Sequence, residues 1–253
     1  MITLYGMSSP NVRKVLIALE EMKLDHEVRH VEVFRGRQFD AEFLALNPMA
    51  KVPVILDPDG PAGAEPIFES GAILVYLAET YAPQFLPASG PERYAVLKWL
   101  FMQVANLGPA IGNHNHFSRI HEEKAYAAGR FRRMTAQAFR ALDRRLGEAQ
   151  YLGGGAYSIA DMASWPWARR YRRFGMADED CPQLVAWVDR IGERPAIARS
   201  DAAIKALGDL DSRDVREATP EEMAMFMGRH IAAPSAQDAG RLPSWWKGRR
   251  GPG

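Results

Sequence analysis

The chain has 253 residues, of which 47% are hydrophobic and 25% charged, with a formal net charge of +1. This composition is typical of one or two globular domains and speaks against a basic nucleic-acid-binding protein. No run reaches the roughly 18 apolar residues of a membrane helix, Met1 leads directly into an apolar segment, and Cys181 is the single cysteine, so we expect a cytoplasmic protein without a membrane partner.

The first 80 residues predict alternating strands and helices. An apolar run at 2–5 predicts a strand, and Ser9-Pro10 supplies a capping hydroxyl and a first-turn proline for a helix. Its apolar residues recur at the spacing of a one-faced helix: Val12, Val15, Leu16, Leu19 and Met22. Segment 28–33 predicts a second strand, 41–46 a short helix, and 52–56 and 66–68 two more strands around a turn. The order β-α-β-(α)-β-β-α predicts a thioredoxin-like layer, in which Tyr5 packs within the first strand.

The helix expected after the strand at 66–68 begins with small and polar residues. Its exposed N–H groups and the positive end of its dipole favour a carboxylate at Ser70 and Gly71. Glu69 stands directly before them and is suited to a ligand ammonium. This segment therefore predicts a binding position for a small zwitterionic group.

The second half of the chain predicts helices only. Segment 82–90 is rich in proline and reads as a linker, and helical patterns follow from Pro91. Ser158 and Asp161 have the spacing of a capping box, and Cys181 precedes Pro182 at another expected helix start. We expect a first domain at 1–82, an all-helical domain at 91–207 and a C-terminal extension at 208–253.

Six segments, taken in this order, resemble the glutathione transferase family, and within it the bacterial Nu-class, Ure2-like enzymes. They are Ser9-Pro-Asn11, Gly36-Arg-Gln38-Phe, Asn47-Pro-Met-Ala-Lys-Val-Pro53, Phe68-Glu-Ser-Gly-Ala72, Trp99-Leu-Phe-Met-Gln103 with Leu107-Gly-Pro109, and Tyr157-Ser-Ile-Ala-Asp161. The likeness runs from Met1 to about Leu207. It implies an α+β thioredoxin-like domain followed by an all-α domain, assembled as a homodimer.

The resemblance also implies a set of glutathione-binding residues. Ser9 and Asn11 would face the thiol as catalytic residues, although members of this class more often have threonine where Ser9 stands. The binding residues implied are Gln38, Lys51, Val52, Pro53, Glu69, Ser70 and Arg130. Val52 would pair its backbone with the cysteinyl part of glutathione, Pro53 would be cis, and Arg130 would reach the ligand, within the subunit or across the dimer.

The first strand-to-helix turn carries no cysteine, whereas redox relatives of this fold have a pair there. If the protein reduces disulfides, glutathione must then bring the reacting thiols, and the resemblance implies a cysteine-free exchange with as many as two glutathione molecules per active site. This favours exchange with a disulfide substrate, or attack on an electrophilic aromatic substrate such as an aryl ether or halide. A catalytically weak binding or regulatory protein on the same fold is the alternative. We expect no metal cofactor.

Residues at the start of the second domain are candidates for the electrophile pocket: Met102, Asn113, His116 and Phe117. The alternative is that they cap helices and satisfy buried polar groups. His114, His116 and His121 have no acidic or cysteine partner at a metal-site spacing, so we expect no metal.

The C-terminal extension is charged at 209–222, apolar at 223–227, and contains Trp245-Trp246. Disordered segments are poor in aromatic residues. We therefore expect the extension to pack back, over the active site or onto a partner subunit. A solvated tail or an interaction motif is the alternative.

Overall fold

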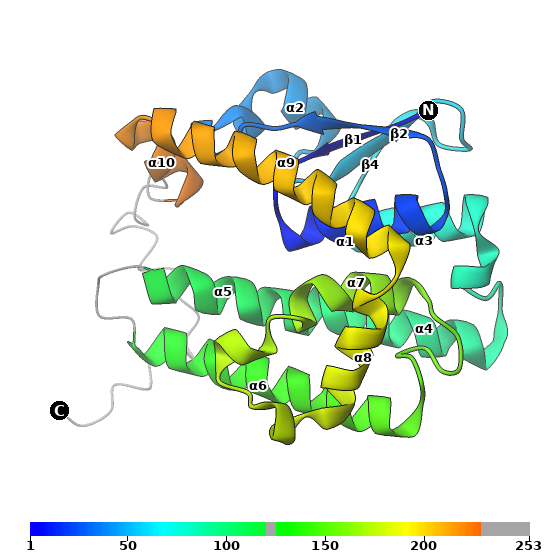
Figure 1. Ribbon diagram of the computed structural model, residues 1–253. Helices are drawn as coiled ribbons and strands as arrows, with labels where there is room; N and C mark the ends of the chain where they lie inside the picture. The colour runs from blue at the N-terminus through cyan, green and yellow to red at the C-terminus, as the bar shows by residue number, and fades with distance from the viewer. Residues whose placement is uncertain (120–124, 229–253) are drawn as a thin grey trace, which may run out of the picture.

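The structure is a computed structural model that describes residues 1–119 and 125–228 (Figure 1). A sheet layer built from the first 81 residues lies against a bundle of helices from the rest of the chain. Within the described residues, no helix has the length and apolar character needed to cross a membrane.

The sheet has four strands in the order β2-β1-β3-β4, with β1 parallel to β2 and antiparallel to β3, and β3 antiparallel to β4. The strands are β1 (Ile2–Gly6), β2 (His26–His30), β3 (Val54–Asp57) and β4 (Gly63–Phe68). The predicted element order is confirmed. The bounds predicted for the second strand were wrong, since β2 ends at His30, opposite Gly6, where β1 also ends.

Alternate side chains of the sheet enter two cores, as the period of a strand requires. Leu4 and Ile55 are fully buried in the main core beside α1 (Pro10–Glu21) and α3 (Ser70–Tyr81). The neighbouring Tyr5 and Val54 join a smaller core on the other face, where the Tyr5 ring meets Phe43 of α2 (Ala41–Leu46) at 6.4 Å. Tyr5 is therefore a packing residue.

The second layer is helical. Its elements are α4 (Gly90–Met102), a π-helical turn (Gln103–Leu107), α5 (Gly108–Arg119), α6 (Ala125–Glu148), α7 (Ile159–Ala168), α8 (Pro182–Gly192), α9 (Pro195–Glu217) and α10 (Pro220–Phe226). The predicted capping box is present at the start of α7, where Asp161 is fully buried and also accepts a hydrogen bond from Trp187 Nε1 at 2.9 Å. All ten residues of α7 are buried, and the helix packs against α1 of the sheet layer.

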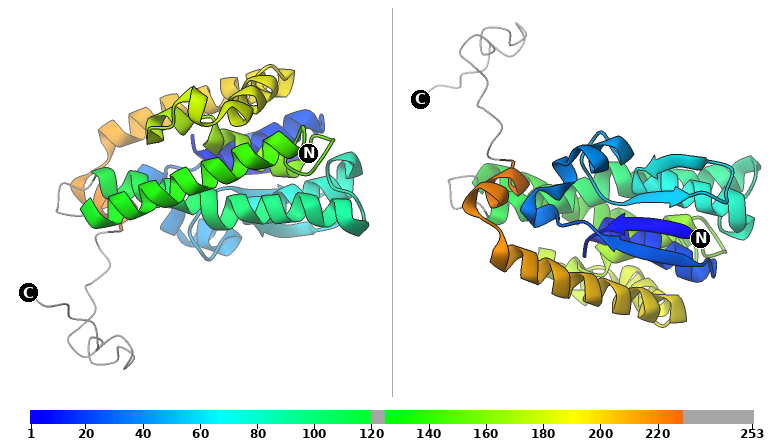
Figure 2. Two further views of the ribbon diagram at one scale, coloured as in Figure 1. Left: turned by 90° about the horizontal axis from the view of Figure 1, so that it is seen from below. Right: turned by 90° about the horizontal axis from the view of Figure 1, so that it is seen from above.

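Helix α9 returns from the bundle to the sheet layer and passes along its β2 side (Figure 2). Arg13 of α1 pairs with Asp201 of α9 at 3.2 Å, and Glu21 pairs with Arg194 just before α9. The expected boundary between residues 207 and 208 falls inside α9, so the extension begins as a continuation of this helix. Its described part packs back onto the sheet layer, while Trp245 and Trp246 lie outside the described residues.

Candidate active site

The first turn of α1 carries the two residues expected to face a thiol. Ser9 is the N-cap, and its Oγ accepts a hydrogen bond from Val12 N at 3.3 Å. Because Oγ acts as the acceptor there, the hydroxyl hydrogen is available to donate to a ligand. Asn11 follows in the first turn and lines a cavity between the two layers. A hydroxyl, an amide and a helix N-terminus together favour a thiolate.

This cavity has a volume of about 420 Å³ and lies between α1, α3 and the helical layer. Its lining residues are Asn11, Lys14, Lys51, Glu69, Ser70, Gln103, Val104, Gly108, Pro109, Gly112, Asn113 and Trp167. The structure thus brings together five of the residues singled out in the sequence: Asn11, Lys51, Glu69, Ser70 and Asn113.

The start of α3 has the features expected for binding a zwitterion. Glu69 has φ +65°, a left-handed conformation that is costly outside glycine and that tends to occur at functional sites. Ser70 is the first helical residue and is buried, and the N–H groups of a first turn have no partner within the helix. A carboxylate at this helix start would gain those N–H groups, with Glu69 beside it for an ammonium.

Three further residues implied by the resemblance, Gln38, Val52 and Pro53, are, like Ser9, not among those that line the cavity. The Val52–Pro53 peptide bond is cis, as the resemblance implied. Gln38 lies in a short 3₁₀ turn (Arg37–Phe39), is 4% exposed, and has no hydrogen-bond partner for its Oε1. A buried amide oxygen without a partner is costly, so a ligand donor would be favoured there.

Lys14 is a site residue that the sequence analysis missed. Its side chain is 1% exposed, lines the cavity, and donates from Nζ to Gln103 Oε1 at 2.6 Å. Burial lowers the pKa of Lys14 to about 7, with the charge of Glu69 partly opposing the shift. The spacing of Lys14 could have indicated its position. It follows Asn11 by three residues, and residues i and i+3 share a helix face, so both are expected on the side of α1 that lines the cavity.

The helical layer contributes buried donors to the same cavity. Gln103 Nε2 and Trp167 Nε1 are both buried without a hydrogen-bond partner, and both residues line the cavity. A Cβ on Gly108 would lie 2.8 Å from Gln103 Nε2, so a larger residue there would displace this amide. Together with Lys14, these groups give the cavity three nitrogen donors, which favour an anionic ligand.

Several predicted residues are not among those that line this cavity. Met102 borders a separate cavity of about 270 Å³ between α4 and α6, because it points about 100° away from the neighbouring Gln103. Phe117 stacks on Phe131 of α6, with His116 against its edge. Arg130 is exposed on α6.

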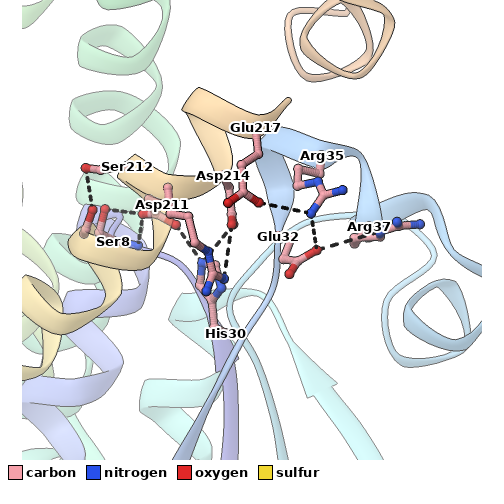
Figure 3. Close-up of polar contacts among 11 residues, drawn as sticks. Ser8, His30, Glu32, Arg35, Arg37, Asp211, Ser212, Asp214 and Glu217 are labelled. Atoms are coloured by element: carbon pink, nitrogen blue, oxygen red, sulfur yellow. Dashed lines mark hydrogen bonds and ion pairs between the residues drawn. The ribbon is translucent and has the colours of Figure 1, made fainter. Parts of the chain in front are cut away.

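The histidine cluster of α5 has a structural role in the described residues. His114 Nδ1 lies 3.1 Å from Ala128 O, and its ring packs on Phe174, so it joins α5 to its neighbours. His121 lies outside the described residues. A different group has its ligand atoms within 4.8 Å of one another, near enough to share a metal ion: His30, Asp211 and Asp214 (Figure 3).

Cys181 is not part of the cavity. It is fully buried at the N-cap of α8, and its Sγ lies 3.4 Å from Ala177 O. Burial raises the pKa of the Cys181 thiol. Since the thiolate is the reactive form, burial and the raised pKa disfavour Cys181 as a nucleophile.

Two sequence profiles match the chain in the order of its two layers. The profile described as "Glutathione S-transferase, N-terminal domain" matches residues 8–80, and "Glutathione S-transferase, C-terminal domain" matches residues 101–195. Among curated proteins, the disulfide-bond oxidoreductase YfcG of Escherichia coli (strain K12) is 41% identical over 213 residues. That match covers 83% of this chain and 98% of YfcG.

Solved structures agree with this likeness. A glutathione transferase family member from Pseudomonas fluorescens Pf-5, with two glutathione molecules bound, is 34% identical with a TM-score of 0.72, covering 79% of this chain and 91% of that chain. The glutathione transferase URE2P8 from Phanerochaete chrysosporium, with oxidised glutathione, is 28% identical with a TM-score of 0.77. This match covers 82% of this chain and 96% of that chain.

Proposed function

The chain belongs to the glutathione S-transferase family, and from this premise we propose that it is a glutathione-dependent disulfide reductase. One observation limits the chemistry to a thiolate supplied by glutathione, and the 41% identity to the disulfide-bond oxidoreductase YfcG favours disulfide reduction among the reactions of such a thiolate. The first turn of α1, from which Asn11 lines the cavity, has Ser9 as its N-cap and carries no cysteine, while Cys181 is buried with a raised pKa. The protein therefore supplies donors for a thiolate, and its substrates supply the sulfur atoms.

In the proposed reaction, glutathione binds with its γ-glutamyl end at Glu69 and Ser70 and with its thiol at Ser9 and Asn11. Donors from Ser9 and Asn11 stabilise the thiolate, which attacks one sulfur of the substrate disulfide. That S–S bond breaks, a mixed disulfide forms, and the other sulfur leaves as a thiolate that takes up a proton. A second glutathione thiolate then attacks the mixed disulfide, which releases oxidised glutathione and the second substrate thiol.

The nitrogen donors of the cavity support a site for this second glutathione. Lys14, Gln103 and Trp167 line the cavity, and their ammonium, amide and indole nitrogens are buried beneath its surface. Glutathione carries two carboxylates, so these donors suit its approach. The solved relative from Pseudomonas fluorescens holds two glutathione molecules.

The experiment combines calorimetric titration with reduced and oxidised glutathione and steady-state reduction of a small disulfide by excess glutathione. We expect binding and turnover in the wild type, and a lower kcat in Ser9→Ala and in Asn11→Ala. Ser89→Ala is the matched control, because this exposed serine makes no side-chain cap hydrogen bond and should leave turnover unchanged. Binding without turnover would instead favour conjugation or ether cleavage, and absence of binding would favour a regulatory protein on this fold.

We also infer a homodimer in the cytoplasm, built on the α3–α4 face. A cavity of about 510 Å³ on this face has a mainly apolar lining that includes Val75, Leu100 and Phe101. Phe101 is 60% exposed and Tyr94 on the same helix is 70% exposed, which is unusual for large rings unless a partner covers them. Sedimentation should give a dimer for the wild type and a monomer for Phe101→Glu. A monomeric wild type would contradict the inference, and with it any role of Arg130 across the dimer.

A further inference from the structure

The turn that precedes α1 is tied to the far end of the chain through Ser8. Both Ser8 N, at 2.8 Å, and Ser8 Oγ donate to Asp211 Oδ2 of α9, across 203 residues of sequence (Figure 3). Ser8 directly precedes Ser9, the N-cap of α1. One carboxylate oxygen therefore receives two hydrogen bonds from the residue next to the proposed thiol donor.

The Asp211 carboxylate is itself fixed in orientation. Its other oxygen, Oδ1, accepts from His30 Nε2 at 2.8 Å, and Asp211 is 5% exposed. His30 is the last residue of β2, and its Nε2 also lies 3.6 Å from Asp214 Oδ2, which is buried with no hydrogen-bond partner. The imidazole thus holds Oδ1 in place, so that Oδ2 is directed at Ser8.

The segment that carries Asp211 has a second attachment to the sheet layer. After α9, helix α10 lies against the 3₁₀ turn Val33–Arg35, where the Phe226 and Phe34 rings are 4.5 Å apart. Arg35 lies 3.6 Å from Glu217 and 3.8 Å from Glu222. The position of Asp211 is therefore set from both sides, by its own helix and by the contacts that follow it.

We propose that Asp211 is a positioning residue for the thiol site: it holds the Ser8–Ser9 turn so that the Ser9 hydroxyl meets the glutathione sulfur. This inference rests on the proposed function, in which Ser9 donates to the thiolate. A thiolate donor acts only within hydrogen-bond reach, and small displacements of a positioned group reduce rate steeply. Loss of the Asp211 carboxylate frees the turn without removing any group that touches glutathione.

The test compares Asp211→Ala with a conservative rescue and a matched control. Asp211→Asn retains an oxygen that accepts from Ser8 and an amide N–H that can donate to His30 Nε2 in the tautomer protonated on Nδ1, so it should restore most of the activity. Asp214→Ala removes a buried carboxylate from the same helix and the same histidine but has no contact with Ser8. It therefore reports what loosening of α9 does by itself. Ser8→Ala keeps the backbone donor and should give an intermediate effect.

We expect Asp211→Ala to lower kcat for disulfide reduction about 10-fold, with the KM for glutathione changed less than about 2-fold. The pKa of enzyme-bound glutathione, followed by thiolate absorbance, should rise in Asp211→Ala and remain at the wild-type value in Asp214→Ala. All samples contain a chelator, because His30, Asp211 and Asp214 could gather an adventitious metal ion. Equal losses in Asp211→Ala and Asp214→Ala would overturn the proposal, since Asp211 would then act only by anchoring α9.

Amide hydrogen exchange gives a readout that needs no glutathione. The Ser8 amide should exchange faster in Asp211→Ala than in the wild type, because its acceptor is gone. Unchanged exchange would refute the tether itself. If the wild-type Ser8 amide is protected but the protein does not bind glutathione, the contact between Ser8 and Asp211 is real but the proposed function is wrong. The positioning role of Asp211 would then be wrong as well.

Discussion

Replacing Lys14 by methionine should make the protein more stable below pH 7, with a gain that shrinks as the pH rises. Lys14 is 1% exposed, and its Nζ donates a hydrogen bond to Gln103 Oε1 at 2.6 Å. Burial lowers its pKa from 10.5 to about 7. Methionine has a similar length and no charge, so it removes the buried ammonium without opening a large void.

The sign follows from proton binding in the two states. Between about pH 7 and pH 10, the unfolded chain keeps the Lys14 proton that the folded protein has lost, so wild-type stability rises with pH in this window. Below pH 7 both states are protonated and the full cost of the buried charge remains. The shift corresponds to roughly 4–5 kcal/mol. Leaving Gln103 Oε1 without its donor offsets about 1–3 kcal/mol, so the net gain near pH 6 is about 1–4 kcal/mol.

Urea unfolding of the wild type and Lys14→Met at several pH values from about 6 to 9 measures this difference directly. Lys98→Met is the control, because Lys98 lies exposed on α4 and its loss should have a small effect at every pH. A Lys14→Met protein that is less stable than the wild type near pH 6 would refute the reasoning. A stability difference that does not change with pH would refute it as well.

Three further outcomes are expected. Ile55→Ala should lower the free energy of unfolding by about 2–5 kcal/mol and weaken glutathione binding in calorimetry, since fully buried Ile55 supports the strand that follows Val52; a stable variant with normal binding would contradict this layout. Ser158→Ala should cost about 0.5–2 kcal/mol in thermal unfolding, because Oγ caps α7, and an unchanged melting temperature would contradict the capping role. S-methylglutathione has no thiol proton, and its binding above pH 7 should be accompanied by proton uptake, because a bound carboxylate favours the charged form of Lys14. Calorimetry in buffers of different ionisation enthalpy measures this uptake. Proton uptake that persists in Lys14→Met would have to come from another group.

The features that the sequence predicts well have local causes. Ser9-Pro10 and the Ser158–Asp161 pair begin helices through contacts three residues apart, and both helix starts are as expected. The short helix at 41–46 has its predicted bounds. The order of strands and helices along the chain follows from the same local patterns, because each apolar run is bounded by a turn.

Features that depend on distant partners were not predictable in this way. Val31 alternates in sequence as a strand residue would, yet β2 ends at His30 because β1 offers no further partner, and Val31 joins the small core instead. The buried Lys14 donates its hydrogen bond to Gln103, which lies 89 residues away in a π-helical turn. The contact of Asp211 with Ser8 spans 203 residues, and no local pattern marks it.

The most direct test of the central claim, that glutathione and not the protein supplies the attacking thiol, is steady-state reduction of a small disulfide by glutathione in wild type and Cys181→Ala. Cys181 is the single cysteine of the chain and is buried at the start of α8. The account predicts that wild-type turnover saturates with glutathione concentration. It also predicts that Cys181→Ala, provided that it is folded at the assay temperature, retains this turnover. Loss of turnover in folded Cys181→Ala, or a wild-type rate no faster than the uncatalysed exchange, would contradict it.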